Sequence, residues 1–231
     1  MSYDVSFRAY VWLIIQNYRR QKKDMKRFLS DLLQRTPAIY LLFHLFRPRL
    51  KGVRGGLQSV HDEYALANNE STVAVDLGCG LSPRNLFKSS KCYGVDLFED
   101  NENGVFKCNL GFEPLPFDSD SLDYLTAYDL LEHIPRFADL PAYGNTPFIF
   151  LMNECYRVLK KGGRFLSMTP IYPFMGAFQD PTHNNIMTVD TFTCYFSDEQ
   201  SHIASHYGIN TNFKIRYQRM LGQHLIAVLE K

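Results

Sequence analysis

The 231-residue sequence lacks the features that mark several other protein classes. It has no C-x-x-C pair, no internal repeat and no low-complexity segment. Its five cysteines, an odd number, are scattered at positions 79, 92, 108, 155 and 194. Such spacing argues against a disulfide framework. Together with the absence of a cleavable signal peptide, it predicts a protein of the reducing cytoplasm whose cysteines mostly pack in the core.

Long apolar runs and a strong net charge are also missing. The run Ala38–Phe46 has nine residues, too few for a bilayer span, which needs about 20. The net charge of +1 hides an asymmetry, because residues 1–60 carry 12 Lys and Arg against 3 Asp and Glu, a net +9. The other residues carry 13 and 21, a net −8. The sequence therefore predicts a basic N-terminal helical extension, residues 1–60, ahead of a domain at residues 61–231.

Two interpretations of this basic extension remain open. It either caps the substrate site with its charges in solvent, or lies as a basic amphipathic surface against an anionic membrane. Binding of nucleic acid is not favoured, because the basic residues are confined to one end and no base-reading motif is present. We expect a cytoplasmic protein that is either free or peripheral to the inner face of the membrane.

Strand and helix patterns alternate after residue 70. A content of 45% hydrophobic residues is enough for one substantial core. Alternation of this kind predicts an α/β fold with a mostly parallel sheet covered by helices on both faces. The expected strands are residues 71–77, 91–97, 104–110, 122–130 and 164–169, with an antiparallel pair at 212–220 and 224–230. A helix is expected at residues 148–160, with Gly162 as its stop.

The segment Val73–Asn85, VAVDLGCGLSPRN, predicts a ligand-binding turn. An apolar strand ends at Asp76 and turns through Gly78-Cys79-Gly80, where glycines let the backbone approach a ligand closely. A second apolar strand ends at Asp96. In a parallel sheet the carboxyl ends of neighbouring strands share an edge, so both acids should lie there. They suit the hydroxyls and positive charge of a nucleoside-like cofactor.

The turn lacks the last glycine of the dinucleotide pattern G-x-G-x-x-G, since that position is Pro83. Only a short helix, residues 83–88, is expected before the next strand. A weak helix start is a poor anchor for a pyrophosphate. The sequence therefore favours a cofactor without phosphate.

Four segments in order resemble class I S-adenosylmethionine-dependent methyltransferases, especially the type-11 branch. They are VDLGCG, GVDL at Gly94–Leu97, the stretch Asn109–Arg136, and Glu154–Pro170. The resemblance implies a Rossmann-like, seven-stranded sheet whose last strand is antiparallel. It also implies an enzyme that uses S-adenosylmethionine and releases S-adenosylhomocysteine.

By this resemblance the methionine part of the cofactor lies over the glycine turn, the ribose on Asp96, and the adenine between Leu97 and the Asn109-Leu110 loop. Ser82 replaces a third glycine, and Asn109 replaces the expected acid but keeps a carbonyl acceptor. An alternative for Asp76 is a carboxylate that shapes the loop, and for Asp96 one that caps the next turn. The full predicted set is Asp76, Gly78, Cys79, Gly80, Asp96, Leu97, Asn109, Leu110 and Tyr128.

Methyl transfer to a hydroxyl benefits from a base, and two histidines are candidates. His133 directly follows the fourth strand. His183 lies in the long loop after the fifth strand, in a DPTHN segment that resembles a loop of many bacterial type-11 enzymes. Asp180 is placed to orient its ring. Alternatively, Asp180 and His183 form an Asx-type turn that fixes the loop.

The spacing of Asp129, Glu132 and His133 offers a further reading, because residues i, i+3 and i+4 share a face on a helix. Oxygen ligands there would suit Mg²⁺ or Ca²⁺, although a helix start is the favoured interpretation. A divalent metal is therefore not the main expectation.

The expected activity is methyl transfer to a hydroxyl of a small molecule or glycan. The alternatives are a quinone-like or protein acceptor, or a non-catalytic module that only binds S-adenosylmethionine. The aromatic residues at positions 172–174 and 192–196 either line an acceptor pocket or form a lid or core.

Overall fold

The computed structural model describes residues 53–66, 71–138, 146–198 and 204–231, with side chains from residue 56 onward. These residues belong to one compact unit, Leu50–Lys231. The predicted basic helices before residue 53 and their proposed membrane contact lie outside the described residues. None of the helices in the described part is both long and apolar enough to cross a bilayer.

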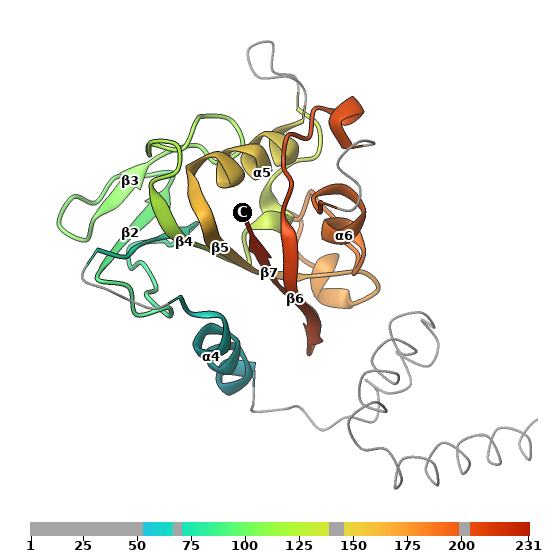
Figure 1. Ribbon diagram of the computed structural model, residues 1–231. Coiled ribbons are helices and arrows are strands. Elements are labelled where there is room, and N and C mark those ends of the chain that lie inside the picture. The colour runs from blue at the N-terminus through green and yellow to red at the C-terminus, as the bar shows by residue number, and fades with distance from the viewer. Residues whose placement is uncertain (1–52, 67–70, 139–145, 199–203) are drawn as a thin grey trace, which may run out of the picture. The chain divides into compact units, whose positions relative to one another are not determined.

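A seven-stranded sheet forms the centre of this unit, in the order β3-β2-β1-β4-β5-β7-β6 (Figure 1). β7 pairs antiparallel with both β5 and β6, while β1 to β5 run parallel. The predicted fold class, with its antiparallel last strand, is confirmed. The strands are β1 (Val73–Leu77), β2 (Lys91–Asp96), β3 (Val105–Lys107), β4 (Leu122–Tyr128), β5 (Leu159–Pro170), β6 (Lys214–Leu221) and β7 (His224–Glu230).

The strand order reverses at β1, which pairs with β2 on one side and β4 on the other. Asp76 at the end of β1 is in register with Gly94 of β2 and Thr126 of β4. Open α/β sheets bind ligands outside the carboxyl ends of their strands at such a reversal. The topology therefore brings the ends of β1, β2 and β4 to one edge, hereafter the rim.

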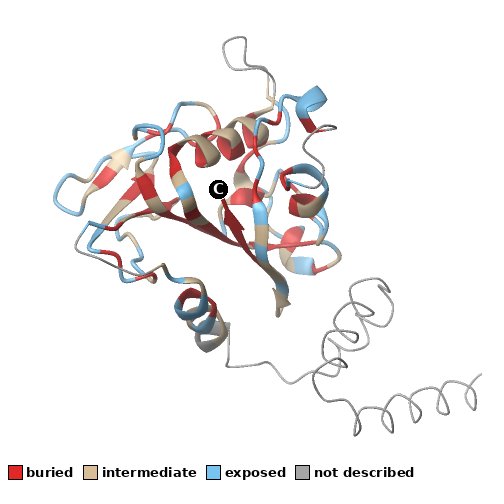
Figure 2. Ribbon diagram, viewed as in Figure 1, coloured by how far each residue is buried: buried red, intermediate tan, exposed pale blue. Residues whose placement is uncertain are grey.

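Helices cover both faces of the sheet, α5 (Pro147–Val158) on one face and α4 (Val53–Tyr64) on the other (Figure 1). Figure 2 shows the buried residues along the strands and on the side of α5 that faces the sheet. Leu151, Met152 and Cys155 of α5 are fully buried there. The shorter elements are η1 (Leu131–His133), η2 (Met175–Ala177), α6 (Thr191–Tyr195) and η3 (Ser205–Tyr207).

Two local predictions were wrong. Residues 83–88 form turns and not a helix, because the Asn85 side chain accepts from the Ser89 amide (2.9 Å) and donates to the Ser89 carbonyl (2.8 Å). The predicted helix 148–160 ends at Val158, and β5 begins at Leu159. Gly162 therefore does not stop the helix; it lies in β5 with a φ of 81° and donates to the Lys231 carbonyl (2.8 Å).

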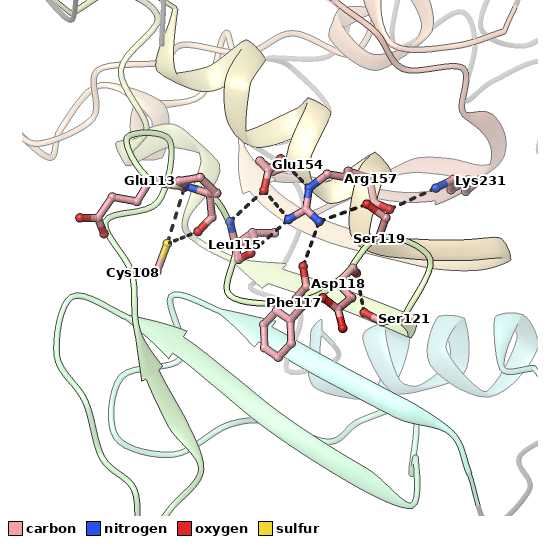
Figure 3. Close-up of polar contacts among 11 residues, drawn as sticks. Cys108, Glu113, Leu115, Phe117, Asp118, Ser119, Ser121, Glu154, Arg157 and Lys231 are labelled. Carbon is pink, nitrogen blue, oxygen red and sulfur yellow. Dashed lines mark hydrogen bonds and ion pairs between the residues drawn. The ribbon is translucent and has the colours of Figure 1, made fainter. Parts of the chain in front are cut away.

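The segment that leads into β4 is fixed by a partly buried ion pair from α5 (Figure 3). Arg157 donates two hydrogen bonds to Glu154, at 2.7 and 2.8 Å. The same guanidinium donates to the carbonyls of Leu115 (3.1 Å) and Phe117 (2.9 Å). Glu154 in turn accepts from the Leu115 amide (2.9 Å). This network anchors the loop that follows Asn109 and Leu110.

The second face of the sheet is closed by α4, whose buried histidine makes two short hydrogen bonds. His61 Nδ1 lies 2.7 Å from the Leu57 carbonyl and Nε2 lies 2.6 Å from the Tyr128 hydroxyl. Since a carbonyl only accepts, Nδ1 carries the proton and Nε2 accepts from the phenol. The ring also packs on Phe87, with centroids 4.7 Å apart. Burial lowers the pKa of His61.

Replacing His61 with Gln is expected to destabilise the protein by roughly 1–3 kcal/mol near pH 8, because it disturbs both buried hydrogen bonds. The difference should shrink as the pH falls below about 6.5, where the unfolded wild-type chain takes up a proton that the folded chain resists. Urea unfolding of both proteins across this range measures the difference. The exposed His206→Gln variant should follow the wild type, and a difference that stays constant with pH contradicts the prediction.

Candidate active site

The turn after β1 strongly favours glycine at position 78. Its φ is 63°, and its amide donates to the Val95 carbonyl at 2.8 Å. A Cβ at this position would lie 2.7 Å from Cδ1 of Leu130. Residues other than glycine adopt such a φ at an energetic cost, and an added Cβ would also force the Leu130 side chain to move. The turn therefore lies against Leu130, the residue directly before η1.

Asp96 joins the glycine turn to the next strand. Its carboxylate accepts from the Gly80 amide at Oδ2 (2.8 Å) and from the Leu97 amide at Oδ1 (2.7 Å). The Asp96 carbonyl accepts from the Cys108 amide (2.8 Å), which brings the following Asn109-Leu110 loop alongside. The residues predicted to hold ribose and adenine are thus neighbours. Leu97 is 63% exposed, whereas Leu110 is buried.

Asp76 is fully buried, and protein groups occupy both of its oxygens. Oδ1 accepts from the Thr126 hydroxyl (2.7 Å), and Oδ2 accepts from the Arg84 amide (2.9 Å) and Nε (3.3 Å). Burial raises the pKa of this carboxyl, while the hydrogen bonds from Arg84 and Thr126 oppose that shift. These contacts are the ones expected of a carboxylate that shapes the loop, and the predicted role of Asp76 in cofactor binding stays a prediction beside them.

Tyr128 at the end of β4 faces α4 rather than open solvent. The phenol bonds His61, and the Arg84 guanidinium lies 4.2 Å from the centre of its ring. Burial raises the pKa of this hydroxyl above its usual range. The Tyr128 hydroxyl is therefore engaged by α4, and the predicted contact of Tyr128 with the cofactor stays a prediction.

Two histidines that are 50 positions apart in the sequence meet next to the rim. The rings of His133 and His183 have centroids 4.7 Å apart and are nearly perpendicular. Thr182 donates its hydroxyl to Asp180 (2.6 Å) and so accepts from Nδ1 of His133 (3.0 Å). Nδ1 of His183 lies 3.4 Å from the Ala177 carbonyl and Nε2 lies 3.9 Å from Asp180. These partners assign the Nδ1–H tautomer to both rings and leave each Nε2 with a lone pair.

The loop after β5 is held to η1 by backbone hydrogen bonds. The amides of Asn184 (2.8 Å) and Asn185 (3.0 Å) both donate to the Glu132 carbonyl. The Asn185 side chain donates to the Leu131 carbonyl (3.0 Å) and accepts from Arg136 (2.7 Å). The predicted catalytic residues His133, Asp180 and His183 are therefore brought together by a connection between distant segments.

Asp129, predicted together with Glu132 and His133, lies apart from this group. It adopts a φ of 51°, which breaks the helical turn that would put the three residues on one face. Its carboxylate contacts Nε2 of His224 at 3.1 Å. Glu132, in contrast, is buried, and its Oε2 accepts from the Thr169 hydroxyl at 2.6 Å.

Residues 75–167, which contain the glycine turn, Asp96 and η1, match the model of the methyltransferase domain family. The chain carries a class I S-adenosylmethionine-dependent methyltransferase domain. S-adenosylmethionine is the methyl donor, as the sequence predicted. No curated protein matches the methyltransferase in sequence.

Solved structures similar to this methyltransferase include a SAM dependent methyltransferase from Archaeoglobus fulgidus, with 16% identity, 82% of this chain and 99% of that chain covered, and a TM-score of 0.47. A SAM dependent methyltransferase from Aquifex aeolicus has 14% identity, coverage of 75% and 87%, and a TM-score of 0.45. Geranyl diphosphate C-methyltransferase from Streptomyces coelicolor A3(2) has 13% identity, coverage of 80% and 88%, and a TM-score of 0.43.

Apolar side chains of the methyltransferase lie exposed in the segment between β5 and His183. Tyr172, Met175 and Phe178 are 50%, 75% and 54% exposed, and the rings of Tyr172 and Phe178 are 6.3 Å apart.

Of the second aromatic group, residues 192–196, Phe192 and Phe196 are core residues. A cavity of about 310 Å³ lies beside them, lined by residues that include Arg136, Phe148, Ile149 and Tyr195.

Gly94 of β2 is a residue whose role the sequence did not reveal. A Cβ there would lie 2.3 Å from the sulfur of Cys79 and 2.7 Å from Cγ of Pro83. Glycine at this position lets the glycine turn after β1 pack directly onto β2. The signal was present in the sequence as the glycine of GVDL.

Replacing Gly94 with Ala is expected to destabilise the methyltransferase by roughly 1–3 kcal/mol, because the added methyl group overpacks the turn. Urea denaturation measures the loss. The same Gly94→Ala substitution should cost less when it is made in a Cys79→Ala background, since the Cys79 sulfur is the atom nearest to the added methyl group. Full stability of Gly94→Ala would show that the turn does not need this close approach.

Proposed function

We propose that this methyltransferase transfers the methyl group of S-adenosylmethionine to a hydroxyl of a small molecule or glycan, and that His183 is the base. The observation that carries the proposal is the pair of imidazoles that η1 and the loop after β5 bring together. Each ring uses Nδ1 in a hydrogen bond and keeps the Nε2 lone pair. A base needs such a lone pair, and an orienting partner for the other nitrogen holds the ring in place.

Methyl transfer is a displacement at a carbon already activated by the sulfonium, so alignment supplies much of the rate. In the proposed reaction the acceptor oxygen attacks the methyl carbon and the carbon–sulfur bond breaks. The acceptor proton passes to Nε2 of His183. The products are the methyl ether, neutral S-adenosylhomocysteine and a protonated imidazole. Asp180, with Oδ2 at 3.9 Å, stabilises the charge that develops on the ring.

In the proposed donor site the ribose hydroxyls bond to Asp96. A carboxylate oxygen can accept more than one hydrogen bond, so the amides of Gly80 and Leu97 need not be displaced. The exposed side chain of Leu97 and the Asn109-Leu110 loop would enclose the adenine. Asp76 would act through the shape that it gives to the turn after β1.

The acceptor class is supported by the exposed aromatic and apolar side chains of Tyr172, Met175 and Phe178, which offer an apolar wall near His183. The basic charge of residues 1–60 supports an anionic or lipid-linked acceptor and contact with an anionic membrane at the cytoplasmic face. A quinone-like or protein acceptor would need the same base.

The test combines donor binding with an acceptor screen. Calorimetric titration with S-adenosylmethionine and S-adenosylhomocysteine should show one site, and a labelled methyl donor should mark small-molecule acceptors in a cell extract. Donor binding without transfer to any acceptor would favour a non-catalytic module. Label that appears only on protein would replace the hydroxyl acceptor with a protein one.

A further inference from the structure

The group at Glu132, His133 and His183 offers more than a base. Among the described residues, one potential ligand atom from each of the three lies within 4.8 Å of the other two. The residues come from η1 and from the loop after β5, which are joined through the Glu132 carbonyl. From these residues we propose that the methyltransferase binds one divalent transition-metal ion of the zinc type at this group.

The buried carboxylate gives independent support for a cation. Glu132 is 1% exposed, and its Oε1 has no hydrogen-bond partner in the described part of the chain. The other oxygen, Oε2, is held by Thr169 at 2.6 Å. A buried polar atom without a partner is costly, and a cation at this position would remove that cost.

In both histidines Nδ1 is hydrogen-bonded to an oxygen of the protein, as in histidines that bind metal ions through Nε2. A metal-binding imidazole usually donates its second N–H to an oxygen of the protein. His133 donates Nδ1–H to Thr182, which is itself bonded to Asp180, and His183 points Nδ1 at the Ala177 carbonyl. Both Nε2 atoms are therefore available to the cation.

The ligand set selects the kind of ion. Two imidazole nitrogens and one carboxylate suit zinc, cobalt or nickel, whereas Mg²⁺ and Ca²⁺ prefer oxygen ligands. Ligands about 2.1 Å from a tetrahedral ion lie roughly 3.4 Å apart, so the group contracts on binding. The Asp180 carboxylate, 3.9 Å from Nε2 of His183, is close enough to serve as a fourth ligand.

Binding has a consequence for catalysis that rests on the proposed function. A cation held by both Nε2 atoms occupies the lone pair with which His183 would accept the acceptor proton. Excess zinc is therefore expected to slow methyl transfer, and a chelator should restore it. The cation and the proton compete for the same atom.

The test measures binding without donor or acceptor. Tag-free full-length protein is treated with a chelator, dialysed and titrated calorimetrically with ZnCl2 or MgCl2; CoCl2 is followed by absorbance. One zinc ion should bind per chain, and MgCl2 should give no signal. His183→Ala and Glu132→Gln should each weaken zinc binding at least about 10-fold.

Two control variants address other zinc ligands, since His206 and Cys194 are exposed and lie outside the group. His206→Ala and Cys194→Ser should bind zinc as the wild type does. Circular dichroism checks that each variant is folded. Should the buried Glu132→Gln variant unfold, the loop variant His183→Ala tests the site alone. The absence of zinc binding, or unchanged affinity in His183→Ala, overturns the metal site. Zinc binding together with no methyl transfer by the chelator-treated protein would instead count against the proposed function.

Discussion

Replacing Asp96 with Ala is expected to weaken binding of S-adenosylhomocysteine roughly 100-fold. Hydrogen bonds to a charged group contribute about 1.5–3 kcal/mol each, and the variant loses those proposed for the ribose hydroxyls. A loss of about 2.8 kcal/mol corresponds to a 100-fold change in affinity. The same substitution removes the acceptor of the Gly80 and Leu97 amides, which loosens the turn. Isothermal titration calorimetry measures the affinity directly.

A matched control for this experiment is Glu99→Ala. Glu99 is an exposed acid three positions beyond Asp96, so its removal changes the local charge equally. Its affinity for S-adenosylhomocysteine should stay within about twofold of the wild type, in keeping with the screening of exposed charges. If Asp96→Ala binds as well as Glu99→Ala, the proposed donor site is wrong.

The second large effect is expected for His183→Ala, whose kcat should fall about 10²- to 10⁴-fold on the acceptor found in the screen. This is the usual contribution of a positioned general base. The affinity for S-adenosylhomocysteine should hardly change, because His183 contacts Asp180 and His133 rather than the glycine turn. The measurement is a steady-state assay with labelled donor and saturating acceptor in the presence of a chelator.

The exposed histidine of η3 gives the control for this assay. His206→Ala removes an imidazole that lies outside the Glu132, His133 and His183 group, so kcat should remain at the wild-type value. A His183→Gln variant keeps a polar side chain but cannot act as a base, and it should be as slow as His183→Ala. Wild-type kcat in either His183 variant would transfer the role of base elsewhere.

The parts of the fold that the sequence predicted depend on local patterns. β1 and β7 are short apolar runs bounded by turn residues, and the antiparallel direction of β7 follows from the short hairpin that joins it to β6. The turn at Gly78 and the acid at Asp96 are likewise encoded within a few residues. The turn and the acid lie close together because β1 and β2 are adjacent parallel strands, as expected for an α/β fold.

The failures arise where a side chain or a distant segment decides the backbone. Asn85 bonds locally to Ser89 and ends any tendency toward a helix after Pro83. The left-handed backbone of Asp129 separates it from Glu132, although helical spacing would join them. The meeting of His133 and His183 depends on the amides of Asn184 and Asn185, which no spacing rule connects to η1.

The hydrogen bonds from Asn184 and Asn185 to Glu132 join two stretches of the chain for which different roles are proposed. The residues proposed to hold the methyl donor all precede η1. The exposed side chains proposed to meet the acceptor follow β5. Several hydrogen bonds around η1 join the two stretches, among them those from the amides of Asn184 and Asn185. Evolution can therefore remodel the later stretch for a new acceptor while the earlier one stays unchanged, provided that the carbonyl of residue 132 keeps its two amide partners.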